Sequence, residues 1–249
     1  MVSIVSVAPP PCVAGLCMPA TARKTPLTIT CVAAAMLGPG LAALLYAVLL
    51  EGVTAARAVY YGSKLLFLLL PAAWLILVAG RPIRLPRPST AGLTPALLFG
   101  LLVAIGIVAL YHLHFAGRLN TEGLEAKARV FGATRHYLLY AAFLALANAA
   151  YEEYLWRWFV FGRLRELMAV GPAAFLSAVA FGLHHFVVAW AVFGSAPLAA
   201  LLTAGVVVGG LAWALMYHRW GNLWSVWLSH AVVDAGLLLV GNDLLGSLG

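Results

Sequence analysis

Charged residues are scarce in this chain of 249 residues. Asp, Glu, Lys and Arg together make up 9% of it, against about 25% in an ordinary soluble domain. Hydrophobic residues make up 64%. A soluble fold of this length could not hide so much apolar surface, because more than half of a folded protein's surface still faces water. The composition therefore excludes a cytosolic globular protein, a disordered tail and a disulfide-stapled secreted domain, and it indicates a polytopic membrane protein.

Cysteine is also rare, which argues against a metal or redox centre built from thiols. The three cysteines (Cys12, Cys17 and Cys31) lie near the N-terminus, and none has a His at metal-ligand spacing. We interpret them as small apolar residues. The net charge is +7, but the basic residues lie mostly between apolar runs. This arrangement predicts contact with anionic lipid, and no nucleic-acid partner.

Long apolar runs rich in Leu, Ala and Val recur along the chain. Each is long enough to cross roughly 30 Å of hydrocarbon as a helix, and none shows the apolar/polar alternation of an outer-membrane barrel. We therefore predict an all-α fold, a polytopic membrane helix bundle with about seven transmembrane helices. The predicted spans are 27–50, 60–80, 93–115, 137–161, 172–193, 199–217 and 222–241. Five glycines are expected to let helices approach closely: Gly100, Gly106, Gly205, Gly209 and Gly210.

These runs suggest four regions: an N-terminal tail (1–26), N-terminal transmembrane helices (27–136), a transmembrane core (137–241) and a C-terminal tail (242–249). Within the second region, residues 116–136 have the pattern of an amphipathic helix lying at the membrane interface. Lys and Arg counts place the N-terminus in the cytoplasm, with Arg57 and Lys64 counted in loops on the other side. We expect an integral multi-pass protein of a prokaryotic inner membrane.

The informative residues are the ionisable groups inside these spans, because each is costly in lipid and is a functional hypothesis by default. The fourth span contains Glu152, Glu153 and Arg157. Glu153 and Arg157 are one helical turn apart and can pair, whereas Glu152 points about 100° away and can face the bundle interior. The alternative interpretation places both carboxylates at the water boundary, near Arg163 and Arg165.

Histidines occur in two later spans. His184 and His185 are adjacent in the fifth, so only one of them is expected to face a polar cavity. In the seventh, His230 and Asp234 are one turn apart, so the carboxylate can orient the imidazole. For a lone histidine in a membrane span a structural hydrogen bond is the commoner role, and the alternative interpretation of His230 and Asp234 is a pair that stabilises a helix end.

Taken together, these spans predict that the Glu, His and Asp side chains meet in one polar cavity, because unpaired buried charges are too costly to scatter. A carboxylate in an apolar wall can act as a general base, an imidazole can share the attacking water, and a second imidazole can donate to an oxyanion. The cluster is chemically competent for hydrolysis.

Three motifs occur in order on separate spans: Glu152-Glu153-x-x-x-Arg157, Phe181-x-x-x-His185 and His230-x-x-x-Asp234. This series resembles the CAAX prenyl protease and bacteriocin-processing family of glutamate-type intramembrane proteases. The resemblance covers residues 137–241, whereas residues 1–136 show hydropathy alone.

The resemblance implies a role for each matching residue. Glu152 matches the base that activates water, with Glu153 and Arg157 as its supporting pair. His185 matches the imidazole that orients the water, and His230 with Asp234 matches the motif associated with oxyanion stabilisation. The family often has Asn where this chain has Asp234, so we assign Asp234 to orienting His230 or to acting while protonated. His184 lies outside the pattern and has no assigned role.

The resemblance leaves metal dependence open, because the family has been described both as metalloproteases and as glutamate-dependent proteases. Glu152, His185 and His230 could hold a Zn²⁺ ion, but the soluble H-E-x-x-H signature is absent. We favour a glutamate-activated water with no required cofactor. The expected substrate is a lipid-anchored or hydrophobic membrane peptide.

Three other functions use the same residues. A proton- or ion-coupled transporter would use the Glu/His/Asp cluster as a relay, although no inverted repeat is visible. Haem ligation would use His185 and His230. A non-enzymatic membrane partner would keep the residues without the chemistry.

Overall fold

The computed structural model describes residues 25–50, 53–83, 87–130 and 136–246. Within these ranges every regular element is a helix, which confirms the predicted all-α bundle. Six helical segments are long and apolar enough to cross a membrane. They are Pro26–Leu49, Thr54–Leu77, Leu93–Phe115, Val170–Phe193, Ala196–Trp220 and Leu223–Gly246. The chain is an integral multi-pass membrane protein.

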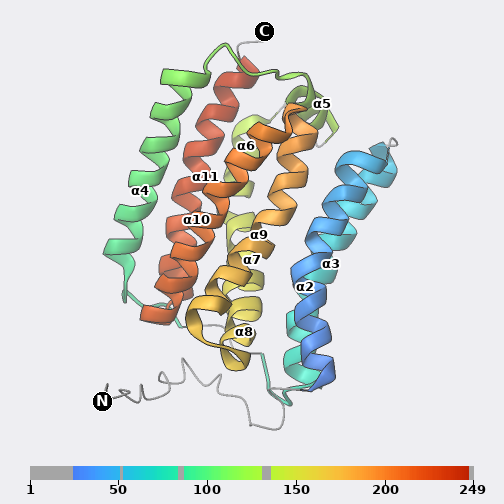
Figure 1. The fold of residues 1–249 in the computed structure, drawn as a ribbon, viewed down its shortest axis with the longest axis vertical. Coiled ribbons are helices and arrows are strands. Elements are labelled where there is room, and N and C mark those ends of the chain that lie inside the picture. Colours follow the sequence, from blue (N-terminus) through green and yellow to red (C-terminus); the bar gives the residue numbers. More distant parts are fainter. Residues whose placement is uncertain (1–24, 51–52, 84–86, 131–135, 247–249) are drawn as a thin grey trace, which may run out of the picture.

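The long helices stand roughly side by side (Figure 1). They are α2 (Pro26–Leu44) with its π-helical continuation η2 (Leu45–Leu49), α3 (Val53–Leu77), α4 (Leu93–Leu110) with η3 (Tyr111–Phe115), α9 (Val170–Phe193), α10 (Ala196–Trp220) and α11 (Leu223–Gly246). Local sequence explains their ends. Ser195 caps α10 by accepting a hydrogen bond from the Leu198 amide, and Gly194 and Gly221 end α9 and α10 in the left-handed conformation.

The predicted span 137–161 is helical but is not one of the six apolar segments. Five short stretches follow one another there without a break: α6 (Tyr137–Ala142), η4 (Phe143–Asn148), α7 (Ala149–Glu153), η5 (Tyr154–Phe161) and α8 (Gly162–Leu167). Its polar residues lower its hydropathy. The run nevertheless passes from the upper end of the bundle to the lower end (Figure 1). With this pass included, the bundle has an odd number of passes, and α2 therefore begins at the lower end whereas α11 ends at the upper end.

Among the predicted boundaries that differ from the structure, two involve polar residues at the end of a helix. α3 begins at Val53, so Arg57 and Lys64, which the sequence analysis counted as loop residues, lie within a helix. α11 continues to Gly246, past the predicted end of its span at residue 241. Both predictions were wrong for the same reason: polar residues lower the local hydropathy but do not end a helix.

The predicted amphipathic segment contains helix α5 (Glu122–Val130), and residues 131–135 lie outside the described part. α5 packs closely on the end of α9, because a Cβ atom at Gly123 would meet the Val192 carbonyl oxygen at 2.2 Å. Lys127 Nζ donates to the Ala47 carbonyl at 2.7 Å, and partial burial lowers the pKa of its ammonium. This helix covers the upper end of α9.

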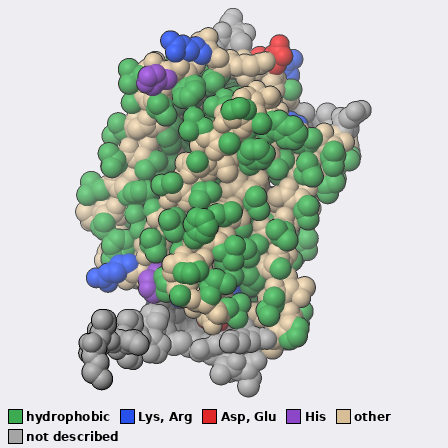
Figure 2. All heavy atoms as spheres, in the orientation of Figure 1, with side chains coloured by type: hydrophobic (Ala, Val, Ile, Leu, Met, Phe, Trp, Pro, Cys, Tyr) green, Lys and Arg blue, Asp and Glu red, His purple; other side chains and the backbone are tan. Residues whose placement is uncertain are grey.

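The exterior is largely apolar (Figure 2), as lipid contact requires. Inside, Trp156, Phe159, Phe161 and Phe181 are almost completely buried. Small residues bring helices together at only some of the predicted positions. Gly100 on α4 contacts Ser229 on α11, and Gly210 contacts α9, but nothing lies near Gly106 or Gly205, so the prediction was wrong for those two. Close packing places α4 against α11 and α9 against α10.

Candidate active site

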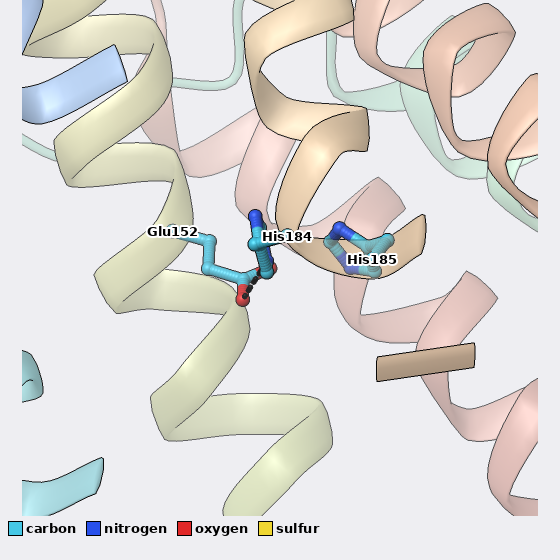
Figure 3. Close-up of side chains that lie close together, drawn as sticks. All are labelled: Glu152, His184 and His185. Carbon is cyan, nitrogen blue, oxygen red and sulfur yellow. Dashed lines mark ion pairs between the residues drawn. The ribbon is translucent and has the colours of Figure 1, made fainter. Parts of the chain in front are cut away.

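Ionisable side chains from four helices meet midway along the bundle. α7 supplies Glu152 and Glu153, α9 supplies His184 and His185, α11 supplies His230 and Asp234, and α3 supplies Lys64. Figure 3 shows Glu152 on α7 facing His184 on α9, with His185 beside it. The carboxylates therefore lie within the bundle and not at the water boundary.

Glu152 is at the centre of this cluster and is only 5% exposed. Its Oε1 lies 3.7 Å from His184 Nε2 and accepts a hydrogen bond from Asn148 Nδ2 at 3.0 Å. Its Oε2 lies 3.7 Å from His230 Nε2. The two oxygens of one carboxylate thus face imidazoles from two different helices.

His185 has a defined tautomer. Its Nδ1 is 3.0 Å from the Phe181 carbonyl oxygen, which can only accept, so Nδ1 carries the hydrogen. Nε2 is then left with its lone pair, as a base or a metal ligand requires. The ring centroids of His184 and His185 are 4.0 Å apart, and His184 stacks on Trp156. Both histidines consequently reach the same side of α9.

His230 is held on both edges and on one face. Nδ1 donates to Glu153 Oε1 at 2.7 Å, Nε2 lies 3.5 Å from Asp234 Oδ1, and the ring stacks on Trp213 with centroids 4.2 Å apart. The contact with Asp234 was predicted from their spacing. The orienting contact at Nδ1, however, comes from Glu153, which the sequence paired with Arg157 alone.

Glu153 and Arg157 form the predicted pair, with Glu153 Oε1 3.1 Å from an Arg157 guanidinium nitrogen. Both side chains are buried. The guanidinium also lies over the rings of Phe181 and Trp213, at 4.6 and 5.1 Å from their centroids. Arg157 therefore balances the charge of Glu153 and braces the aromatic face on which His230 stacks.

A cavity of about 30 Å³ adjoins Glu152. This volume has room for at least one water molecule, whose centre needs roughly 10–15 Å³. Its wall includes polar and aromatic side chains: Tyr46, Tyr60, Lys64, Tyr151, Glu152 and His184. Water can therefore sit against the Glu152 carboxylate within a mostly apolar bundle.

Sequence reasoning missed three members of the cluster. Lys64 was counted in a loop, Asn148 was not considered, and His184 had no role. The available signal was the presence of a Lys, a His and an Asn inside apolar runs, where polar groups are costly. Their partners are distant in sequence, so the spacing of motifs could not show the contacts.

Comparison with known proteins gives one match. The family model for the Rce1-like type II CAAX prenyl endopeptidases matches residues 134–236. The family predicted from the motifs is confirmed over this segment. No curated protein and no solved structure matches the chain significantly.

The Rce1-like segment contains every residue of the three motifs, and the family is one of intramembrane endopeptidases. The match gives no support to the transporter alternative. Lys64 lies outside the matched segment, although its ammonium is 3.9 Å from Glu152 Oε1. The site as the structure presents it is therefore larger than the family segment.

One group in the Rce1-like segment could hold a metal ion. Glu152, His184 and His185 each offer a ligand atom, and these atoms lie within 4.8 Å of one another. Two imidazoles and a carboxylate are a donor set that Zn²⁺ accepts. The group differs from the predicted set in one residue, because His184 takes the place of His230.

Proposed function

We propose that this protein is an intramembrane endopeptidase that hydrolyses a peptide bond near the membrane face of a lipid-anchored or hydrophobic peptide. The observation that carries the proposal is the position of Glu152. Its carboxylate lies deep in the bundle, 3.7 Å from imidazoles of both α9 and α11 and beside a cavity with room for water. This is the arrangement that general-base hydrolysis needs.

In the proposed reaction, Glu152 removes a proton from water as the oxygen attacks the peptide carbonyl carbon. His185, whose Nε2 keeps its lone pair and whose ring lies beside that of His184 on the cavity wall, holds the water's other hydrogen. The C–N bond then breaks, and the proton held by Glu152 passes to the leaving amine. Atoms and charge balance without a further reactant.

His230 is the proposed donor to the developing oxyanion. Glu153 accepts its Nδ1 hydrogen, so a second proton on Nε2 makes an imidazolium that points toward the reacting side of Glu152. The cluster contains three carboxylates (Glu152, Glu153 and Asp234) but only two side chains that are ordinarily cationic, Lys64 and Arg157. An imidazolium at His230 balances this formal charge, which supports its role as a donor.

We propose that the reaction needs no metal. The Lys64 ammonium already lies 3.9 Å from Glu152 Oε1, and a divalent cation on the same carboxylate would be repelled by it. In the metal-dependent alternative, Glu152, His184 and His185 would hold a Zn²⁺ ion that lowers the pKa of bound water.

Chelation separates the two mechanisms. We expect a membrane-permeant chelator to leave the cleavage rate of the purified protein unchanged, because the carboxylate itself takes the proton. The rate is measured before chelation, after it, and after addition of Zn²⁺. A loss of activity that Zn²⁺ restores would show that the metal mechanism operates instead.

The central experiment compares wild type with Glu152→Gln in detergent, using candidate membrane peptides and reading the products by mass. The amide keeps the shape of the side chain but cannot take a proton, so cleavage is expected to fall by about 100- to 10,000-fold, the range of one general base. Glu122→Gln, an exposed carboxyl of α5, is the matched control. Turnover retained in Glu152→Gln would exclude the proposed base.

A further inference from the structure

Lys64 is a cation inside a membrane-spanning helix, and its contacts are directed at Glu152. It lies near the middle of α3, outside the Rce1-like segment. Nζ donates to Asn148 Oδ1 at 2.5 Å, lies 3.9 Å from Glu152 Oε1, and sits 4.4 Å from the centroid of the Tyr151 ring. A cation at this depth is costly, so its placement calls for a function.

Asn148 connects Lys64 to the carboxylate. It precedes Glu152 by one helical turn, accepts from Lys64 through Oδ1 and donates through Nδ2 to Glu152 Oε1 at 3.0 Å. The amide therefore uses both of its polar atoms in one chain of hydrogen bonds. This chain engages Oε1 and leaves Oε2 facing His230 Nε2.

We propose that Lys64 and Asn148 are positioning residues that fix the Glu152 carboxylate through Oε1, with Oε2 directed at His230 and the carboxylate held against the cavity that has room for water. This inference rests on the proposed endopeptidase function. It gives the N-terminal helices a part in the reaction: α3 completes a site whose other charged members lie on α7, α9 and α11. The carboxylate would otherwise rotate about its last torsion, and its reacting oxygen would lose its alignment with His230.

Anchoring of a substrate carboxylate by Lys64 fits the geometry less well. A chain terminus bound to Nζ would lie close to Glu152, whose charge has the same sign. An extended peptide also needs about 3.3 Å per residue. The terminus and the cleaved bond would then be separated by little more than one residue, which suits a carboxypeptidase and not an endopeptidase.

The first test is a double-mutant cycle. Lys64→Met and Asn148→Leu should each lower kcat by about 10- to 100-fold with little change in KM, which is the size expected for a misplaced reacting group. Because the two residues act in one chain, the double variant should lose no more than the worse single variant. Arg57→Met, an exposed cation on the same helix, should leave kcat unchanged.

The second test separates charge from packing. In a background with Cys12, Cys17 and Cys31 replaced by Ala, Lys64→Cys should lose activity as Lys64→Met does. Alkylation with bromoethylamine adds an ammonium at nearly the length of lysine and should restore at least a third of the wild-type kcat. Alkylation with an ethyl group adds similar bulk without charge and should restore none.

The outcomes are distinguishable. Multiplicative losses in the cycle, a change confined to KM, or equal rescue by both alkyl groups would overturn the positioning role while wild-type cleavage and the Glu152→Gln result keep the proposed function. An inactive wild type overturns the function and this role with it. In that case we would measure unfolding midpoints in detergent for the four proteins of the cycle. Stability losses that do not add show that the Lys64–Asn148 contact exists.

Discussion

In this site one side chain contacts two others at once, and these shared contacts fix the positions of the reacting groups. Glu153 Oε1 meets both His230 Nδ1 and the Arg157 guanidinium, at 2.7 and 3.1 Å. Removal of either partner would leave the buried carboxylate with only one group to balance its charge. Breaking a buried pair in this way typically lowers the free energy of unfolding by about 3–5 kcal/mol. Glu153 therefore ties the orientation of the imidazole on α11 to a cation on η5.

Asp234 offers a prediction at this scale, because its Oδ1 lies 3.5 Å from His230 Nε2. Asp234→Asn keeps the shape and adds a hydrogen-bond donor beside the proposed oxyanion, so we expect kcat within about tenfold of wild type. Asp234→Ala removes the contact and should lower kcat by on the order of 100-fold. Steady-state cleavage by both variants is the measurement. Equal losses would show that the charge of Asp234 itself is required.

The same residues show what sequence can reveal about a site. Glu152, His185 and His230 could be predicted to lie in one cluster, because each stands in a motif inside an apolar span. Lys64 and Asn148 could not, because they are 84 positions apart in sequence and meet only where the Lys64 side chain reaches from α3 to η4. Motif spacing reports neighbours along one helix, whereas this contact depends on the packing of two.

Among the elements, α4 and α11 are packed so closely that a side chain on one sets the position of the other. A Cβ atom at Gly100 would lie 2.8 Å from the Ser229 carbonyl oxygen and 3.1 Å from its Cα. Ser229 directly precedes His230, and its hydroxyl accepts a hydrogen bond from Trp213 Nε1 at 3.1 Å. The backbone that carries His230 is therefore held by a glycine on the neighbouring helix.

Gly100→Leu should consequently push α11 away and displace His230. We expect kcat to fall by on the order of 100-fold, the usual cost of moving a reacting group by about 1 Å. Gly106→Leu is the matched control, because it lies on the same helix with nothing within 4 Å of its Cβ position, and it should cleave like wild type. Cleavage by both purified variants, compared at equal folded amounts, checks this. Similar losses in both would mean that α4 tolerates no added bulk.

At the scale of the whole molecule, the apolar exterior is what a bundle of membrane-crossing helices needs for contact with lipid. Six apolar segments and the helical run from Tyr137 to Leu167 make an odd number of crossings. Hydropathy was sufficient to predict this bundle, because lipid requires a continuous apolar stretch for most spans. The run from Tyr137 is the exception, since its polar residues serve the site.

Because α4 and η3 together make a single crossing, we predict that the loop before α4 and the loop after η3 open on opposite sides of the membrane. In the cysteine-free background, Thr90→Cys and Arg118→Cys, both exposed positions, should differ in labelling by an impermeant maleimide on sealed vesicles. We expect Thr90→Cys to react only from the cytoplasmic side. Labelling of both from one side would contradict a membrane crossing by α4 and η3.

The π-helical stretches η4 and η5 lie directly before and after the short helix that carries Glu152 and Glu153. Each wide turn contains an extra residue compared with an α-helix, and the 3.6-residue period of sequence patterns does not show it. If this stretch closed to a regular α-helix of the same length, everything beyond one wide turn would rotate by about 100°, and Tyr151 would take the direction that Glu152 has now. The wide turn, which no motif records, would then decide whether a relative that keeps all three motifs still presents its base to the histidines.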